Sequence, residues 1–352
     1  MSHNQMSTLS MDCLAGSNDD VTSVHMESNQ FWYLPNAIDD LTNLETLTMQ
    51  DNTFIMLGTS MSFASSLRYL TIGADNMPWP KYIDQFHAVT HLTVIGLMCS
   101  TLPFDAFYNM ADTMKELVLQ NNECDQLPDS VHVLKNLEYL SVKGNPNLAS
   151  LDIHNLTSLT TLQIENSSLT AMPNISRSPN LQYLQVTSSP IAVWEIDTLP
   201  HSSKIKNITL DHTKFDHVPT ALRYTPLVEN LSLRNTNVSK VTADAFSGLL
   251  LLRKLDLSDS PIATIEITAF RNNTMLNYIY LDGTGIGEVP RAIGEVENLL
   301  VLDMAGNNIN CTCAELGWMK TWKHLAHITL SGTCHNTGMN LIRYLKEFVP
   351  KC

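Results

Sequence analysis

A leucine-rich pattern recurs about every 23 residues, and no other feature of this chain limits its fold as strongly. The pattern reads LxxLxLxxN/S/T, as in "LEYLSVKGN" from Leu137, "LTTLQIENS" from Leu159 and "LRKLDLSDS" from Leu252. Thirteen units follow one another at spacings of 22 to 25 residues. Their first apolar residues are Val21, Leu44, Leu67, Val89, Met114, Leu137, Leu159, Leu181, Ile205, Val228, Leu252, Leu276 and Leu299. A period held over so much of the chain indicates a repeat architecture.

The central LxL of each unit predicts a short strand whose alternate side chains point inward. One repeat cannot bury its apolar side alone, so neighbouring repeats must stack and share an elongated core. We therefore expect an α/β solenoid in which the strands form one parallel sheet. Residues 21 to 310 resemble the leucine-rich repeat family, which implies a horseshoe of about 13 repeats with the sheet on its concave face.

The ninth residue of each unit is also patterned. In the family that the chain resembles, this residue is usually Asn, which bonds the loop backbone of neighbouring coils. The middle units of this chain have Ser or Thr instead, and a hydroxyl can pair with backbone groups as well. Leu97 stands at this position in its unit and has no polar side chain, so we expect a local irregularity there.

Four cysteines and two tryptophans follow the last repeat, in "NNINCTCAELGWMKTW" and the residues after it. This arrangement resembles the cysteine-rich C-terminal flanking cap of extracellular leucine-rich repeat proteins of the Toll-receptor and adhesion type. The resemblance implies the disulfides Cys311–Cys334 and Cys313–Cys352. Trp318 and Trp322, four residues apart, are expected on one face of a helix that covers the end of the core. A metal site is the alternative for the CxC pair, although metal-binding cysteines usually have CxxC spacing.

The other three cysteines leave alternatives open. Cys99 and Cys124 occupy the same position of adjacent repeats, and we predict buried, reduced thiols there, although the stacking distance also permits a bridge. Cys13 precedes the first repeat and is interpreted as the remnant of an N-terminal cap. The predicted organisation is an N-terminal tail or cap remnant (1–20), the repeats (21–310) and the cysteine-rich cap (311–352).

Charge and hydropathy restrict the partners and the cellular compartment that are expected for this chain. The formal net charge of -14 argues against nucleic acid, because a phosphate binder needs a basic face. No apolar run reaches the roughly 18 residues of a membrane span, so we expect no insertion by this chain. The polar N-terminus lacks the apolar segment of a signal peptide. Two disulfides nevertheless imply an oxidising compartment, so we predict an extracellular protein whose leader is outside this sequence.

The third and fifth residues of each unit are expected on the concave face. They are mostly polar and of medium size, with several tyrosines that could anchor a partner. The predicted partner-binding residues are Tyr69, His91, Glu116, Tyr139, Tyr183, Asp256, Tyr278, Tyr280, Asp282 and Asp303. The alternative is that these positions are simply solvated.

Sequons for N-glycosylation begin only at Asn155. The predicted glycosylation sites are Asn155, Asn166, Asn174, Asn207, Asn230, Asn237 and Asn272. The sequon at Asn310 adjoins the cap disulfide and is expected to stay unmodified. Because Asn207 and Asn230 should lie side by side on the concave face, sugars there would block binding, which points to the first half or an edge as the contact surface.

No catalytic motif or phosphate-binding loop occurs, so we expect no enzyme activity, no cofactor and no metal. The leading hypothesis is an extracellular recognition module, either a receptor ectodomain or a secreted binding protein. The resemblance implies a role in innate immunity or cell adhesion, a protein ligand or co-receptor as partner, and a homo- or heterodimer. The alternatives are a structural matrix protein, which a pull-down with matrix components would reveal, and an intracellular scaffold, which would have free cap thiols.

Overall fold

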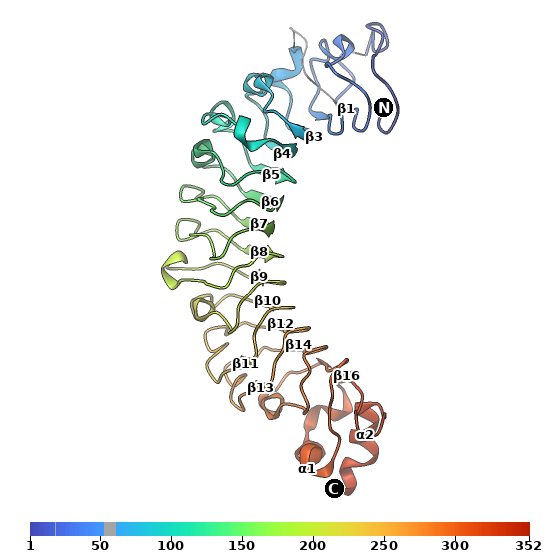
Figure 1. The fold of residues 1–352 in the computed structure, drawn as a ribbon, viewed down its shortest axis with the longest axis vertical. Helices are drawn as coiled ribbons and strands as arrows, with labels where there is room; N and C mark the ends of the chain where they lie inside the picture. The colour runs from blue at the N-terminus through green and yellow to red at the C-terminus, as the bar shows by residue number, and fades with distance from the viewer. Residues whose placement is uncertain (18, 53–60) are drawn as a thin grey trace. The chain divides into compact units, whose positions relative to one another are not determined.

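The computed structural model describes residues 1–17, 19–52 and 61–352, and these form two compact units, Met1–Ser168 and Leu169–Cys352. In both units, successive strands come from successive repeats and pair in parallel (Figure 1). The first apolar residue of every repeat from Leu44 onward is at most 2% exposed. The prediction of a leucine-rich repeat solenoid with a parallel sheet is therefore confirmed. The helices found in the described residues are all too short or too polar to traverse a lipid bilayer.

The N-terminal unit contains seven described strands, each paired with the next along the chain. They are β1 (Ser23–His25), β2 (Thr46–Thr48), β3 (Tyr69–Met77), β4 (His91–Leu97), β5 (Glu116–Gln120), β6 (Tyr139–Asn145) and β7 (Thr161–Ser167). The segments that return between strands contain short 3-10 helices: η1 (Asn36–Ile38), η2 (Ser62–Ser65), η3 (Lys81–Gln85), η4 (Cys99–Thr101), η5 (Tyr108–Met110) and η6 (Asp129–Val133). Stacked phenylalanines fill the core behind them, and the rings of Phe63 and Phe86 lie 5.9 Å apart between centroids.

The C-terminal unit repeats this plan with shorter strands. Its main sheet contains β8 (Tyr183–Thr187), β9 (Asn207–Thr209), β10 (Asn230–Ser232), β12 (Lys254–Asp256), β14 (Tyr278–Tyr280), β15 (Val301–Asp303) and β16 (Thr329–Leu330). A second, two-stranded sheet joins β11 (Lys240–Val241) to β13 (Thr264–Ile265). The return segments hold the 3-10 helices η7 (Ile196–Thr198), η8 (Thr220–Tyr224) and η9 (Arg291–Glu295).

The ninth residues of the repeats are buried, apart from the exposed Asp75, and most of them bond the loop backbone. Asn52 donates to the carbonyls of Met26 and Met49, at 2.8 and 3.1 Å, and accepts from the Phe31 N–H. Thr213, in the C-terminal unit, donates at 2.7 Å to the carbonyl of Leu210. Both side chains satisfy backbone groups that the turn after the strand leaves unpaired.

The irregularity expected at Leu97 is present in the neighbouring strands. β3 and β4 pair regularly up to Gly73 and Ile95, and then the register shifts so that Met77 lies opposite Leu97. The Leu97 side chain is fully buried, and its N–H donates to Asn122 Oδ1 of the next repeat. The following repeat therefore supplies the polar group that Leu97 lacks.

The pairing of Cys99 with Cys124 corrects our expectation of reduced thiols. The structure joins these cysteines, and their Cα atoms lie 4.9 Å apart, within the range for a disulfide. Cys124 is buried as expected, but Cys99 begins helix η4 and is half-exposed. The return segment after β4 thus turns its cysteine towards the neighbouring repeat rather than into the core.

The disulfide-bonded cap has the two bridges that the resemblance implied. Cys311 pairs with Cys334 and Cys313 with Cys352, with Cα–Cα distances of 5.4 and 5.3 Å. The first bridge is buried and the second is exposed. The cap contains α1 (Cys313–Leu316), η10 (Gly317–Thr321), η11 (Lys323–Ala326), α2 (Leu341–Glu347) and η12 (Val349–Lys351).

The expectation that both cap tryptophans share one α-helical face is wrong. Helix α1 ends at Leu316, and the chain continues as the 3-10 helix η10, so the two indoles are tilted by 58° to one another. Trp322 is buried, while Trp318 is half-exposed and packs over Gly294 of η9. Trp318 lies within η10 and Trp322 caps its C-terminal end, so both rings come from one short 3-10 helix rather than from an α-helix.

Candidate functional site

The solvent-facing side of β3 to β7 carries a row of polar and aromatic side chains, which we call the N-terminal sheet face: Tyr69, His91, Glu116, Tyr139 and Gln163. Parallel pairing places Tyr69 opposite His91, His91 opposite Glu116, and Glu116 opposite Tyr139. Because the third residue of each repeat starts its strand in register, residues distant in sequence become direct neighbours.

Contacts along this row hold the side chains in place. The rings of Tyr69 and His91 stack with centroids 4.5 Å apart, and His91 Nε2 lies 3.9 Å from a Glu116 carboxylate oxygen. The Tyr139 hydroxyl donates to Gln163 Oε1 at 2.7 Å. Burial raises the pKa of the Tyr139 phenol, and the charge of Glu116 raises it further against an opposing hydrogen bond with Ser141, so the phenol stays a neutral donor. Tyr69 remains 46% exposed, which leaves an aromatic surface for contact.

The C-terminal sheet face lies on β10, β12, β14 and β15 and is more strongly charged. It combines five of the predicted partner residues with two cations: Asp256, Tyr278, Tyr280, Asp282, Asp303, Lys254 and Arg234. Lys254 Nζ lies 5.1 Å from the centroid of the Tyr280 ring. Arg234 donates through Nε and Nη2 to one oxygen of Asp259, at 3.0 and 2.8 Å. This hydrogen bond raises the pKa of Arg234 above its usual range.

The aspartates of this face are already hydrogen-bonded within the unit. The hydroxyl of Ser258 donates to Asp282, and that of Ser331 donates to Asp303. Asp256 accepts from the backbone N–H of Ser258 at 3.0 Å. These bonds hold the carboxylates in fixed positions, so the face presents ordered negative charge.

The structure does not bring all the predicted partner residues into one place. Tyr69, His91, Glu116 and Tyr139 are contiguous in the N-terminal unit, and the residues from Asp256 to Asp303 are contiguous in the C-terminal unit. Tyr183, which is 50% exposed, lies opposite Asn207 and is separated from Tyr278 by β9, β10 and β12.

The sequon asparagines are exposed except Asn207, which is half-buried. Parallel pairing puts Asn230 directly opposite Asn207, and its amide donates to Asn207 Oδ1 at 2.7 Å. The side-by-side geometry expected for these two residues is therefore present, and their glycosylation stays a prediction.

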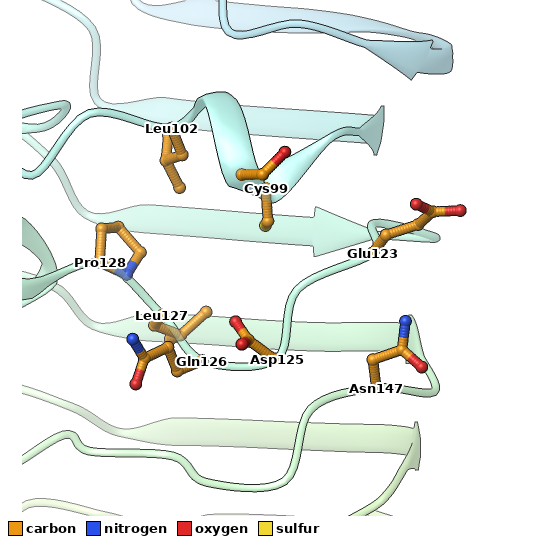
Figure 2. A pocket seen from close by; sticks show the side chains of 9 residues that line it. Cys99, Leu102, Glu123, Asp125, Gln126, Leu127, Pro128 and Asn147 are labelled. Atoms are coloured by element: carbon orange, nitrogen blue, oxygen red, sulfur yellow. The ribbon is translucent and has the colours of Figure 1, made fainter.

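Two features escaped the sequence analysis. One is a surface pocket beside η4, where Leu102, Leu127 and Pro128 lie towards one end and Glu123 and Asn147 towards the other, with Asp125 between them (Figure 2). The other is a cluster of His132, Asp152 and His154 on two return segments. The D-x-H spacing at 152–154 and a histidine one repeat earlier were the available signals, but return segments carry no period that aligns them.

The comparisons identify the repeat. The model of the family described as "Leucine rich repeat" matches residues 226–286. This match and the observed fold show that the chain is built of leucine-rich repeats. A curated relative, Protein SUPPRESSOR OF npr1-1, CONSTITUTIVE 1 of Arabidopsis thaliana, is 30% identical over 193 residues, which cover 53% of this chain and 13% of the relative. Mouse podocan is 24% identical over 240 residues, which cover 59% of this chain and 39% of podocan.

A solved structure, of the Toll–Spätzle complex from Drosophila, shares the fold. Its matching chain superposes with a TM-score of 0.66 at 16% identity, over 93% of this chain and 52% of the other. This leucine-rich repeat protein thus spans well under half of the two curated relatives described above. Proteins of this repeat family are mostly non-catalytic and bind other proteins, so the fold supports a protein-interaction module.

Proposed function

We propose that this leucine-rich repeat protein is an extracellular, non-catalytic recognition module that binds a protein ligand or co-receptor through its N-terminal sheet face. The observation that carries the proposal is the row from Tyr69 to Gln163, in which stacked and hydrogen-bonded side chains line adjacent strands. Such a surface offers aromatic anchors whose conformations are already restricted, which lowers the entropy lost on binding.

The distribution of sequons supports this choice of face. No sequon precedes Asn155, so sugar would leave the strands that carry Tyr69, His91 and Glu116 uncovered. Sugars at Asn207 and Asn230 would instead cover the middle of the C-terminal unit. Glycopeptide mapping of protein secreted from animal cells tests this: both asparagines should be modified, and two bare asparagines would remove the argument for preferring the first unit.

The disulfides support an extracellular location. All the cysteines except Cys13 are bridged in the structure, and bridges persist in oxidising compartments rather than in the cytosol. Thiol labelling of native protein should therefore find one reactive thiol. Labelling of all four cap cysteines would overturn the extracellular proposal.

The binding face is tested with paired tyrosine variants. The wild-type protein is screened against a panel of secreted and cell-surface proteins, and each binder is measured with Tyr69→Ala and with Tyr183→Ala. Both tyrosines stand at the third repeat position and are similarly exposed, which makes Tyr183 a matched control. Loss of the exposed aromatic anchor Tyr69 should weaken binding at least about thirtyfold, whereas Tyr183→Ala should change it less than threefold. The reverse pattern would place the site on the second unit and contradict the proposal.

The fold it shares with the Toll chain supports, within this class, a role in innate immunity or cell adhesion. The Toll structure is a complex with a protein, Spätzle, and that complex is a hub in Drosophila development and innate immunity. A binder from the screen that belongs to the extracellular matrix would favour the matrix alternative instead.

A further inference from the structure

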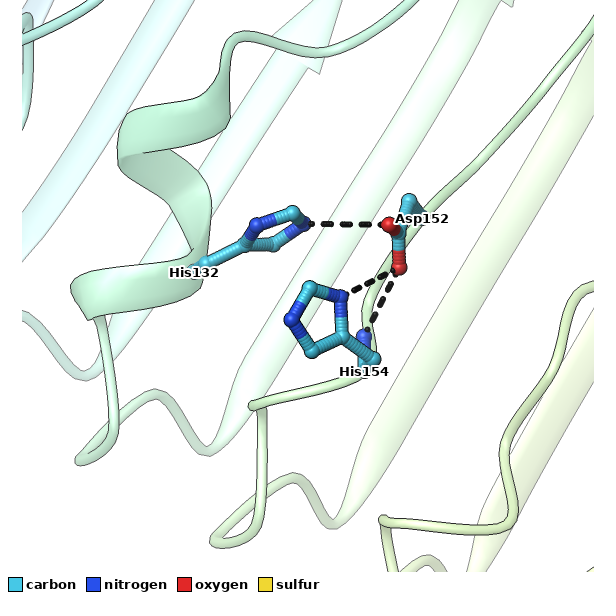
Figure 3. A group of neighbouring side chains, drawn as sticks. All are labelled: His132, Asp152 and His154. Carbon is cyan, nitrogen blue, oxygen red and sulfur yellow. Dashed lines mark hydrogen bonds and ion pairs between the residues drawn. The ribbon is translucent and has the colours of Figure 1, made fainter.

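Two histidines and one aspartate from neighbouring repeats meet on the return segments of the N-terminal unit. His132 lies in η6, and Asp152 and His154 lie in the return segment that follows β6, so the cluster joins two consecutive repeats (Figure 3). The two imidazoles lie against each other, with ring centroids 4.0 Å apart, and Asp152 lies beside both with one carboxylate oxygen towards each ring. The His132 side chain is only 21% exposed, which limits its movement more than that of the other two.

The separations match those of metal ligands. His154 Nδ1 lies 2.8 Å from Asp152 Oδ1, and His132 Nε2 lies 3.6 Å from Asp152 Oδ2. One ligand atom from each of the three residues can be chosen so that all lie within 4.8 Å of one another. Tetrahedral ligands about 2.0–2.1 Å from a zinc ion are about 3.3 Å apart, which falls between the two observed separations. Small side-chain rotations would therefore bring all three onto one ion.

We propose that His132, Asp152 and His154 form a binding site for a divalent transition-metal ion of the zinc type. Imidazole nitrogens favour zinc, copper or nickel over calcium and magnesium, and a single carboxylate adds the negative charge that a divalent ion needs. The protein supplies three ligands, and the exposed side of the cluster leaves a fourth position for water. Bound metal would tie the return segment of one repeat to that of the next.

The alternative for this cluster is a hydrogen-bonded pair of histidines around an aspartate, without metal. The geometry of His217 and Asp216 offers a reference for that case. His217 Nδ1 lies 2.5 Å from an Asp216 carboxylate oxygen on an exposed turn, and no third ligand from another repeat joins them among the described residues. A His–Asp contact by itself should not hold a metal ion, so this pair is the matched control.

The test is titration with Zn²⁺ by isothermal calorimetry, with all proteins carrying Cys13→Ser because that exposed thiol would compete for metal. The parent protein should bind one ion that is lost on substitution of either histidine. We expect His132→Gln and His154→Gln each to weaken binding at least about tenfold, since even an outer-shell partner of a zinc ligand contributes ten- to a hundredfold. His217→Gln should leave the affinity unchanged.

A second readout separates binding from folding. Hydrogen exchange measured by peptide should show slower exchange around residues 129–133 and 152–154 when Zn²⁺ is added, in the parent and in His217→Gln but not in His132→Gln. Circular dichroism confirms that each variant is folded before titration. Absence of a one-to-one site, an affinity in both cluster variants equal to that of the parent, or an equal loss in His217→Gln would each overturn the proposal.

Discussion

The two units mostly satisfy the same buried loop groups with different side chains, although Asn307 in the C-terminal unit bonds two repeats as Asn52 does. In the N-terminal unit, Asn52 reaches the carbonyl of Met26 in the preceding repeat as well as that of Met49 in its own. In the C-terminal unit, Thr213 and Thr284 each donate to the carbonyl three residues earlier in the same repeat. An amide has more hydrogen-bonding atoms than a hydroxyl, so Asn52 bonds the backbone of two repeats at once, whereas Thr213 and Thr284 bond the backbone only of their own turn.

The two units also place their disulfides differently. Cys99–Cys124 links two repeats inside the N-terminal unit, whereas Cys311–Cys334 and Cys313–Cys352 close the end of the C-terminal unit. A repeat in the middle of a stack has a neighbour on each side, but the last repeat would expose its core without a cap. The comparison predicts that the second unit depends most on its terminal bridges and the first on its asparagines.

The largest expected effect is loss of the buried cap bridge. The double substitution Cys311→Ala and Cys334→Ala should lower the free energy of unfolding of the C-terminal unit by about 3 to 4 kcal/mol, because the bridge reduces the conformational entropy of the unfolded chain. Hydrogen exchange by peptide measures the effect locally, and protection of residues 301–345 should fall. If these peptides kept their protection, the proposed dependence on the terminal bridge would be wrong.

The next largest expected effect is the difference in unfolding free energy between removing a ninth-position asparagine and removing a ninth-position threonine hydroxyl. Asn52→Ala removes bonds to four backbone groups and should cost about 2 to 3 kcal/mol, whereas Thr213→Val removes one and should cost about 1 kcal/mol. Urea unfolding, followed by hydrogen exchange in each unit, gives both values. Equal costs would mean that asparagine and threonine support their repeats alike.

The stability contributed by one carboxyl group in each unit should depend on pH with opposite signs. Burial raises the pKa of Asp39 to about 6, with a further contribution from the charge of Asp40, and among the described residues Asp39 Oδ1 has no hydrogen-bond partner. The stabilising neutral form is fully present below the unfolded pKa of 3.8 and is lost as the pH rises through about 6. Asp39→Asn should therefore melt higher than wild type at pH 7.5 and no higher at pH 3.5.

Glu266 in the C-terminal unit provides the opposite case. Its hydrogen bond to Lys240, at 2.7 Å, lowers its pKa from 4.5, and its stabilising charged form is lost as the pH falls through that lowered value. Glu266→Gln should reduce the melting temperature slightly at pH 7.5 and not at pH 3. Melting curves of both variants across this range check the two signs, and matching signs would contradict the contrast.

The smallest effect concerns the order of reduction in the cap. Cys313 and Cys352 are exposed, whereas Cys311 and Cys334 are at most 2% exposed. A mild thiol should reach the exposed bridge first, since exchange requires direct attack on a sulfur atom. Mass spectrometry after timed alkylation should find Cys313 and Cys352 labelled before the buried pair, and simultaneous labelling would show that the cap opens as a whole.

Much of the fold follows from the repeat because burial is decided within each repeat. The LxL strands, the parallel register and the role of the ninth residue depend on a short pattern that recurs thirteen times. The buried asparagines and threonines show that this pattern places polar groups as well as apolar ones. The contiguous row from Tyr69 to Tyr139 was also foreseeable, because register alone aligns the third residue of each strand.

The return segments were the least predictable. Their lengths vary with repeats of 22 to 25 residues, and no common period aligns side chains across them. The backbone conformation at the eighth residue of the repeat was not predicted either, although this position lies within the regular pattern. Asn121, Asn166 and Asp259 have left-handed backbones with φ near +50° to +60°. Short polar side chains tolerate this region best, so the turn selects them.

The amino-acid sequence by itself therefore determined the stack of leucine-rich repeats, its inward and outward faces, and the expected cap bridges. Only the tertiary structure decided that Cys99 meets Cys124, that a 3-10 helix rather than an α-helix carries the cap tryptophans, and that His132 lies beside Asp152 and His154. The physical reason is the distance along the chain over which each effect acts. Burial and register act through a pattern local to each repeat, whereas these meetings depend on how two irregular segments, one repeat apart, turn towards each other.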